Sequence, residues 1–300
     1  MKNNVTTTVI GSYPVNIDNC DLMNNYFGQK EILWNKYIES AVNDMVNAGI
    51  QLVSDGQTRD PFVNIFYRKL GGCRIRERPE VIDKIQYNEP IIIEDQKYVK
   101  QIIPENRQLI GLLAGPHTLS QSCVDLFYND EKELAFDFAE ALRKEAESLQ
   151  KHVDMISIDE PFFSVSMPDY AKELIETVTS GIKKCPVRVH ICGDISEIIP
   201  EILELPVDIL SHEFKATPKL FDAFKDHSFS QRICLGSVRS DKPVVEPVDD
   251  IIKHIRRGID VFGDKISQLA PDCGLRLLPK GIAFQKLKNL VEAGEKIYDR

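Results

Sequence analysis

Residues 155–194 read MISIDEPFFSVSMPDYAKELIETVTSGIKKCPVRVHICGD, and the fold can be inferred by working outward from here. Two short apolar runs, Met155–Ile158 and Val187–Ile191, flank the longer segment Met167–Lys184. The outer runs have the length and β-branched content of buried strands, and the segment between them has the length of a helix. We therefore predict a strand, a helix and a second strand in this order.

The same alternation extends along the chain in both directions. The short apolar runs number eight: Thr7–Ile10, Gln51–Ser54, Gln108–Leu113, Met155–Ile158, Val187–Ile191, Ile209–Ser211, Gln231–Leu235 and Ile266–Leu269. The helical segments between them include Ile32–Ala48, Glu131–Gln150, Met167–Lys184, Ile195–Leu205, Pro218–Asp226, Pro247–Phe262 and Phe284–Tyr298. This pattern predicts an α/β protein with a (β/α)8 TIM barrel, and not an open doubly wound sheet. Because no linker-like tract interrupts it, residues 1–300 are predicted to form a single domain.

One segment departs from the alternation. Residues 74–107 contain the runs RIRER, DKIQYNEPIIIE and QKYVKQII, separated by proline and acidic residues. We interpret this segment as a hairpin-like excursion between the second and third barrel strands. It begins at the C-terminal side of the second strand, so we expect it beside the mouth of the barrel.

Composition excludes several classes of protein. Hydrophobic residues make up 43% of the chain, yet no unbroken apolar stretch approaches the roughly 18 to 20 residues that span a bilayer. The net charge of -9 argues against a nucleic-acid partner, because phosphate binding depends on clustered Lys and Arg. The N-terminal MKNNVTTTVIGSYP lacks the features of a secretory signal, and the seven cysteines are scattered without CxxC spacing. We expect a cytoplasmic protein with free thiols and no membrane partner.

Four residues in the second half of the chain have the types and settings of a zinc site. His190 and Cys192 are two apart on a predicted strand, so their side chains point the same way. Glu213 ends the run VDILSHEF, and Cys273 lies in APDCGL after another strand-like run. Imidazole, thiolate and carboxylate are ligands that zinc accepts in a tetrahedral set. Since all four follow strands, we expect them at the catalytic end of the barrel.

The motifs IGSYP, GPHT, IDEP, HICGD, SHEF and PDCGL, in this order, resemble those of cobalamin-independent methionine synthases. The resemblance is greatest to the short "core" members of archaea and some bacteria. It implies one zinc ion held by His190, Cys192, Glu213 and Cys273. It also implies that homocysteine is bound by Asp159 and by the turn Ile10, Gly11 and Ser12. A carboxylate suits an ammonium, and a Gly-Ser turn can offer backbone N–H groups to a carboxylate.

The sequence also departs from the folate-using members of this family. Those members carry an N-terminal domain that helps bind the folate, and this sequence has no counterpart. Ser122 stands where they have a tryptophan, and Val165 replaces a second acid. Ser240 or Asp241 lies nearest the place of their proton-donating histidine, and Asp241 is the one candidate catalytic residue beyond the zinc site. Gln57 or Asp55 lies nearest the place of a glutamate that contacts homocysteine in the family, and we take Gln57 as the candidate substrate residue. We therefore expect a methyl-corrinoid, free or on a corrinoid protein, as the donor in place of methylfolate.

Three alternatives remain open from the sequence. The thiol could be coenzyme M, although a sulfonate without an amine would be a poor neighbour for Asp159. The chain could be a lyase resembling uroporphyrinogen decarboxylase, which needs no metal. It could also be a non-catalytic subunit that docks a methyl donor in a larger complex.

Overall fold

The computed structural model describes residues 5–27, 32–60 and 62–298. Its main sheet has eight parallel strands in the order β1-β11-β10-β9-β8-β7-β5-β2. A parallel bridge between Thr8 and Leu52 joins the two ends of this order, so the sheet closes into a ring. The strands are β1 (Thr6–Thr7), β2 (Leu52–Val53), β5 (Gln108–Ala114), β7 (Met155–Asp159), β8 (Val187–His190), β9 (Ile209–His212), β10 (Arg232–Val238) and β11 (Ile266–Pro271). The predicted (β/α)8 barrel is confirmed.

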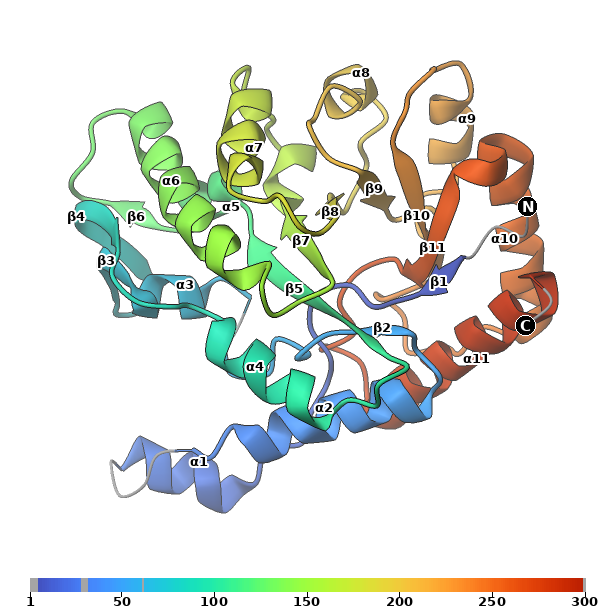
Figure 1. Ribbon diagram of the computed structural model, residues 1–300, viewed down its shortest axis with the longest axis horizontal. Coiled ribbons are helices and arrows are strands. Elements are labelled where there is room, and N and C mark those ends of the chain that lie inside the picture. Colours follow the sequence, from blue (N-terminus) through green and yellow to red (C-terminus); the bar gives the residue numbers. More distant parts are fainter. Residues whose placement is uncertain (1–4, 28–31, 61, 299–300) are drawn as a thin grey trace.

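Helices cover the outside of the ring, with one main helix after each strand (Figure 1). These helices are α2 (Asn35–Asn47), α4 (Ile93–Ile102), α6 (Glu131–Leu149), α7 (Ala171–Ser180), α8 (Ile199–Ile202), α9 (Leu220–Lys225), α10 (Val248–Phe262) and α11 (Lys280–Tyr298). The large core lies between helices and strands, while a smaller apolar cluster fills the interior of the barrel. Ile110 and Leu112 belong to the inner cluster, and Leu109 and Leu113 to the outer one. This alternation along β5 is the period of a strand that is buried on both faces.

Helix α10 illustrates how a barrel helix is specified. Its buried residues Ile251, Ile255, Gly258 and Phe262 recur at the spacing of one helical face. Gly258 lets the helix approach the sheet, because a Cβ atom there would lie 2.7 Å from Cδ2 of Leu235. The sequence pattern alone therefore sets which side of α10 packs on the barrel.

Shorter helices and strands lie in the connections between the barrel strands and the barrel helices. They are α1 (Asn19–Tyr26), α3 (Asn64–Lys69), β3 (Leu70–Ile75), β4 (Pro79–Tyr87), α5 (Pro116–Gln121), β6 (Val124–Asp125) and the 3-10 turns Pro161–Ser164 and Gly263–Lys265. Strands β3 and β4 form an antiparallel hairpin, and β6 extends it to a three-stranded sheet. Helix α1 projects from the lower left of the barrel in Figure 1.

The predicted excursion over residues 74–107 is only partly correct. The hairpin is present but starts earlier, at Leu70, and ends at Tyr87. The run QKYVKQII is not a strand, because it belongs to α4, which is the barrel helix between β2 and β5. Gln96 and Val99 face the core at helical spacing. Glu145 of α6 accepts hydrogen bonds from the N–H groups of residues 91 and 92 (3.0 and 2.8 Å), which stabilises the start of α4.

A buried arginine crosses the interior of the barrel below the catalytic end. The Arg188 side chain on β8 is fully buried. Its guanidinium donates to the Val9 carbonyl oxygen (3.1 Å), to Oε1 of Gln268 (3.2 Å) and to Oγ of Ser157 (3.2 Å). Arg188 thus ties β8 to β7, to β11 and to the end of β1, three strands that also carry residues of the candidate site.

Candidate metal and substrate site

Three of the predicted metal ligands lie together at the ends of β8 and β11. The ligand atoms of His190, Cys192 and Cys273 all lie within 4.8 Å of one another. His190 ends β8, Cys192 follows it by two positions, and Cys273 follows the end of β11. The i, i+2 spacing on a strand places the first two on the same side, as the sequence predicts. The side chains of this group can supply one imidazole and two thiolates to a metal ion.

The orientation of His190 suits metal binding. The His190 side chain is buried, and its Nδ1 atom lies 3.1 Å from Oγ of Ser211 on β9. Its Nε2 atom is buried and has no hydrogen-bond partner among the described residues. A buried nitrogen without a partner is costly, and a metal ion would satisfy it. A histidine held at one ring nitrogen and open at the other is the arrangement that metal sites use.

The pKa of Cys273 describes this group without a metal ion. The neighbouring Cys192 thiol, together with burial, raises the pKa of Cys273 well above that of a free thiol. Burial alone would lower the pKa of His190, but Cys273 beside it raises that pKa. Without a metal ion the Cys273 thiol is therefore protonated at neutral pH. A divalent cation is what would convert these side chains to a thiolate set.

The fourth predicted ligand, Glu213, does not belong to the close group. Its Oε2 accepts a hydrogen bond from the Gly193 N–H (2.9 Å), so the carboxylate lies next to the Cys192 segment. Asp272 connects the two loops, because its carboxylate accepts from the N–H groups of residues 215 and 216 (3.0 and 2.7 Å). The loop after Glu213 is therefore fixed to the residue that precedes Cys273. The structure thus brings three predicted ligands together and leaves Glu213 adjacent to them.

All the predicted substrate residues line one cavity with the metal group. The cavity has a volume of about 350 Å³. Its lining comprises Ile10, Gly11, Ser12, Gln57, Phe62, Asp159, Pro161, His190, Cys192, Cys273, Gly274, Arg276 and Leu277. The sequence analysis missed Phe62, Arg276 and Leu277. A signal for Arg276 was present, since it lies three residues after a predicted ligand at a strand end.

Asp159 is a buried acid in this cavity. It is 3% exposed, and its Oδ1 accepts a hydrogen bond from Oγ of Ser157 (2.8 Å). Burial raises its pKa, whereas the nearby His190 and Arg188 side chains lower it and offset part of that increase. A buried carboxylate that faces a cavity without an ion-pair partner among the described residues is suited to a cationic ligand group.

The Gly11–Ser12 turn and Gln57 form another part of the cavity wall. Gly11 has φ +52°, and Gln57 has φ +45°, the only positive φ among described residues other than glycine. The Gln57 N–H donates to Oδ1 of Asp55 (2.9 Å), which holds this unusual backbone. A Cβ atom on Gly11 would lie 3.3 Å from Oε1 of Gln57. Backbone strain of this kind is concentrated at binding sites.

Asp241, the candidate catalytic residue, does not line the cavity. It makes a bidentate ion pair with Arg239 (2.7 and 2.5 Å). The hydrogen bond from Arg239 lowers the pKa of Asp241. This carboxylate is therefore ionised at neutral pH and paired with Arg239. Ser122 and Val165 also lie outside the cavity lining. They are the two other positions at which the sequence differs from the folate-using members.

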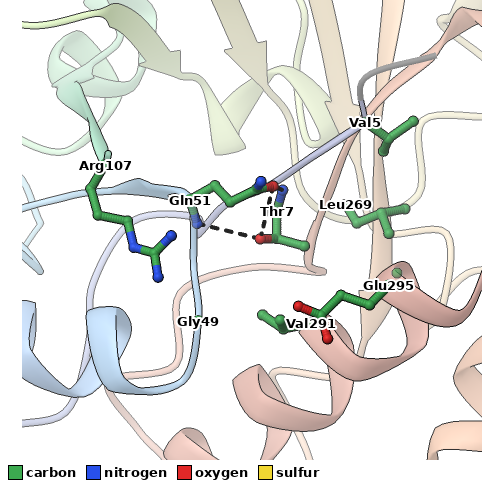
Figure 2. A pocket seen from close by; sticks show the side chains of 9 residues that line it. Val5, Thr7, Gly49, Gln51, Arg107, Leu269, Val291 and Glu295 are labelled. Carbon is green, nitrogen blue, oxygen red and sulfur yellow. Dashed lines mark hydrogen bonds between the residues drawn. The ribbon is translucent and has the colours of Figure 1, made fainter. Parts of the chain in front are cut away.

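A second cavity lies between β1 and the C-terminal half of α11 (Figure 2). Its volume is about 130 Å³. Figure 2 shows Arg107 and Glu295 on opposite sides of this space, with Thr7 and Gln51 hydrogen-bonded between them. None of the predicted site residues lines it. The candidate metal group and the predicted substrate residues therefore share one cavity, at the other end of the barrel strands.

Fold and site together define a TIM-barrel protein whose strand ends present a His-Cys-Cys group that could hold a metal ion. A comparison with known families matches residues 5–296 to "Cobalamin-independent synthase, Catalytic domain". The chain is 36% identical to a methionine synthase of Methanocaldococcus jannaschii, over 96% of this chain and 97% of that protein. It is 35% identical to a methionine synthase of Methanothermobacter marburgensis, over 96% and 98% respectively.

Two solved structures share the fold. A B12-independent methionine synthase from Shewanella sp. W3-18-1 in complex with selenomethionine superposes with a TM-score of 0.82 at 23% identity, covering 98% of this chain and 97% of that one. A putative vitamin-B12 independent methionine synthase from Listeria monocytogenes gives 0.80 at 17% identity, covering 98% and 99%. The chain belongs to the cobalamin-independent synthase family and corresponds to its catalytic domain. It is a methyltransferase that acts on a thiol.

Within the described residues, no helix combines the length and apolar character required to cross a bilayer.

Proposed function

We propose that this protein is a zinc-dependent methyltransferase that converts homocysteine to methionine. One observation carries the proposal: a His-Cys-Cys group and a buried carboxylate line the same cavity of about 350 Å³. A metal group alone could be structural, and a buried acid alone could be part of the fold. Their convergence on one space provides a place for a thiol and for an ammonium of the same small molecule.

The metal would be held by His190, Cys192 and Cys273, with Glu213 as the fourth ligand. Bound zinc supplies the positive charge that lets a substrate thiol lose its proton near neutral pH. Ser211 keeps Nε2 of His190 directed toward the ion by engaging Nδ1 (3.1 Å). In this proposal Glu213 turns from the Gly193 N–H, which it now contacts, toward the zinc.

The remaining cavity residues would orient homocysteine. Asp159 receives the α-ammonium, since it is the only carboxylate among the described residues that line the cavity. The turn Ile10, Gly11 and Ser12 presents backbone N–H groups to the α-carboxylate. Gln57, pressed against Gly11, closes this side of the cavity. With both ends of the amino acid fixed, its sulfur is directed toward the His-Cys-Cys group.

We propose a methyl-corrinoid as the donor. Transfer from methylfolate requires a proton for the departing nitrogen, whereas cobalt(I) leaves without one. The position of Asp241 supports the corrinoid, because this candidate proton donor is not among the described lining residues of the cavity and is paired with Arg239. We also place the enzyme in the cytoplasm, which is consistent with seven free cysteines.

A methyl-transfer assay tests the function. The zinc-loaded protein is offered homocysteine or coenzyme M, each with methylcobalamin or methylfolate. We expect methionine from homocysteine and methylcobalamin. Transfer from methylfolate alone would contradict the proposed donor, and methylation of coenzyme M alone would contradict the proposed thiol.

The metal ligand is tested with Cys273→Ser. This variant should lose both zinc and activity, because a hydroxyl is a much poorer zinc ligand than a thiolate. Cys185→Ser is the matched control, since Cys185 is also a partly exposed free thiol but lies outside the cavity. Retention of zinc and activity in Cys273→Ser would refute the site.

A further inference from the structure

We propose that Arg276 binds the carboxylate of the thiol substrate and makes the enzyme select amino-acid thiols. The inference rests on the proposed function and adds a residue to it. Arg276 lies three positions after Cys273 and lines the same cavity. No motif or comparison assigns it a role.

The guanidinium of Arg276 is held in place by backbone atoms and not by an acid. Nη1 donates to the Asp60 carbonyl oxygen (3.0 Å), and Nη2 donates to the Gln57 carbonyl oxygen. Among the described residues it makes no ion pair. Burial lowers the pKa of Arg276, and the nearby Asp55 and Asp60 carboxylates offset part of this effect. A fixed guanidinium with further N–H donors available is suited to a carboxylate.

Arg276 is also joined to the turn that is proposed to hold the carboxylate. The Leu275 N–H donates to the Ser12 carbonyl oxygen (2.7 Å). A Cβ atom on Gly274 would lie 2.9 Å from Oγ of Ser12, so the two loops are in close contact. The loops after β1, β2 and β11 therefore meet at one corner of the cavity. Arg276 is the only Arg or Lys among the described residues that line this cavity.

The charges of the cavity match a zwitterion. Apart from the candidate metal ligands, Asp159 and Arg276 are the only ionisable residues among its described lining residues. They carry opposite charges and come from different parts of the chain, since Asp159 ends β7 and Arg276 lies in the loop after β11. An amino-acid thiol has three groups to place: an ammonium, a carboxylate and a sulfur. Asp159, Arg276 and the His-Cys-Cys group offer one partner for each.

Arg276 could instead serve only to hold the Gln57 loop, and a pair of substrates separates the two roles. Homocysteine is compared with 3-aminopropane-1-thiol, which lacks only the carboxylate. Binding of each thiol to the zinc-loaded protein is measured by calorimetry, and kcat and KM are measured with methylcobalamin. The variants are Arg276→Ala and Arg276→Lys, with Arg257→Ala on α10 as the control. Zinc content and thermal stability are recorded for each variant.

We expect wild type to bind homocysteine about tenfold to a hundredfold more tightly than the analogue, as befits a hydrogen bond to a charged group. Arg276→Ala should weaken the binding of homocysteine by this factor and change the affinity for the analogue less than about twofold. The zinc content of this variant should equal that of wild type. Arg276→Lys should retain part of the preference for homocysteine over the analogue, since lysine keeps the positive charge but lacks the paired N–H donors of a guanidinium.

Equal weakening of both thiols would show that Arg276 only holds the loop, and an unchanged preference in Arg276→Ala would show that it has no role. Either result overturns the inference and leaves the proposed function intact. A wild-type protein that binds neither thiol overturns both.

Discussion

At the scale of single residues, the hydrogen bonding of the two His190 ring nitrogens is the main feature of the candidate metal site. His190 has one ring nitrogen engaged by Ser211 and the other buried without a partner in the described structure. A metal ion bound in the cavity would satisfy the second nitrogen. Ser211 lies on β9, the strand next to β8, and its role is invisible in the sequence because the two residues are 21 positions apart. The sequence could predict that His190 and Cys192 lie on the same side, but it could not predict that Ser211 contacts His190.

Ser211→Ala should therefore weaken zinc binding without unfolding the protein. Loss of a partner that orients a histidine ligand typically reduces metal affinity about 10- to 100-fold. Competition with a chelator measures the affinity, and circular dichroism monitors the fold. Ser237→Ala is the control, because Ser237 is also buried but bonds only to the Leu235 carbonyl oxygen (2.9 Å). Equal zinc affinity in Ser211→Ala and wild type would remove Ser211 from the site.

At the scale of helices and strands, the alternation of apolar runs with helical segments was sufficient to predict the barrel. Each of the eight predicted runs overlaps a strand of the ring. The exception is α4, because residues 91–103, IIIEDQKYVKQII, which contain this helix, begin with a β-branched run and resemble a strand locally. Its helical form depends on Glu145 of α6, more than 50 positions away, and on packing against α2. Tertiary contacts of this kind override local propensity.

Helix α10 gives a prediction on pH. Nε2 of His254 lies 2.8 Å from the Gly236 carbonyl oxygen, and its ring packs on Phe221. Burial lowers the pKa of His254 to about 4, whereas an unfolded histidine titrates near 6.5. Between these values the unfolded chain binds a proton that the folded chain does not. The free energy of unfolding therefore falls as the pH falls from about 6.5 to about 4, by at most about 1.4 kcal/mol per pH unit from this group.

His254→Gln should flatten this dependence, since glutamine keeps a donor for Gly236 but does not titrate. Urea unfolding between pH 4.5 and 7 provides the free energies. His227→Gln is the control, because His227 is exposed and should behave as wild type. A slope in His254→Gln equal to that of wild type would show that the buried ring does not contribute.

At the scale of the whole molecule, ring closure assembles the site from both ends of the chain. Gly11 and Ser12 follow β1, Asp159 ends β7, and Cys273 follows β11, and β1 pairs with β11. The sequence could predict that these strand ends share one end of the barrel. It could not predict that Arg276 reaches the carbonyl groups of the β2 loop, more than 200 positions earlier. That residues 1–300 form one domain stays a prediction.

The central claim is that the His-Cys-Cys group holds a zinc ion to which the substrate sulfur binds. Zinc X-ray absorption of the loaded protein, recorded with and without homocysteine, tests it most directly. We predict one additional sulfur neighbour of the zinc, at about 2.3 Å, when homocysteine is present. Homoserine, which has oxygen in place of the sulfur, should add none. An unchanged number of sulfur neighbours in the presence of saturating homocysteine would contradict the claim.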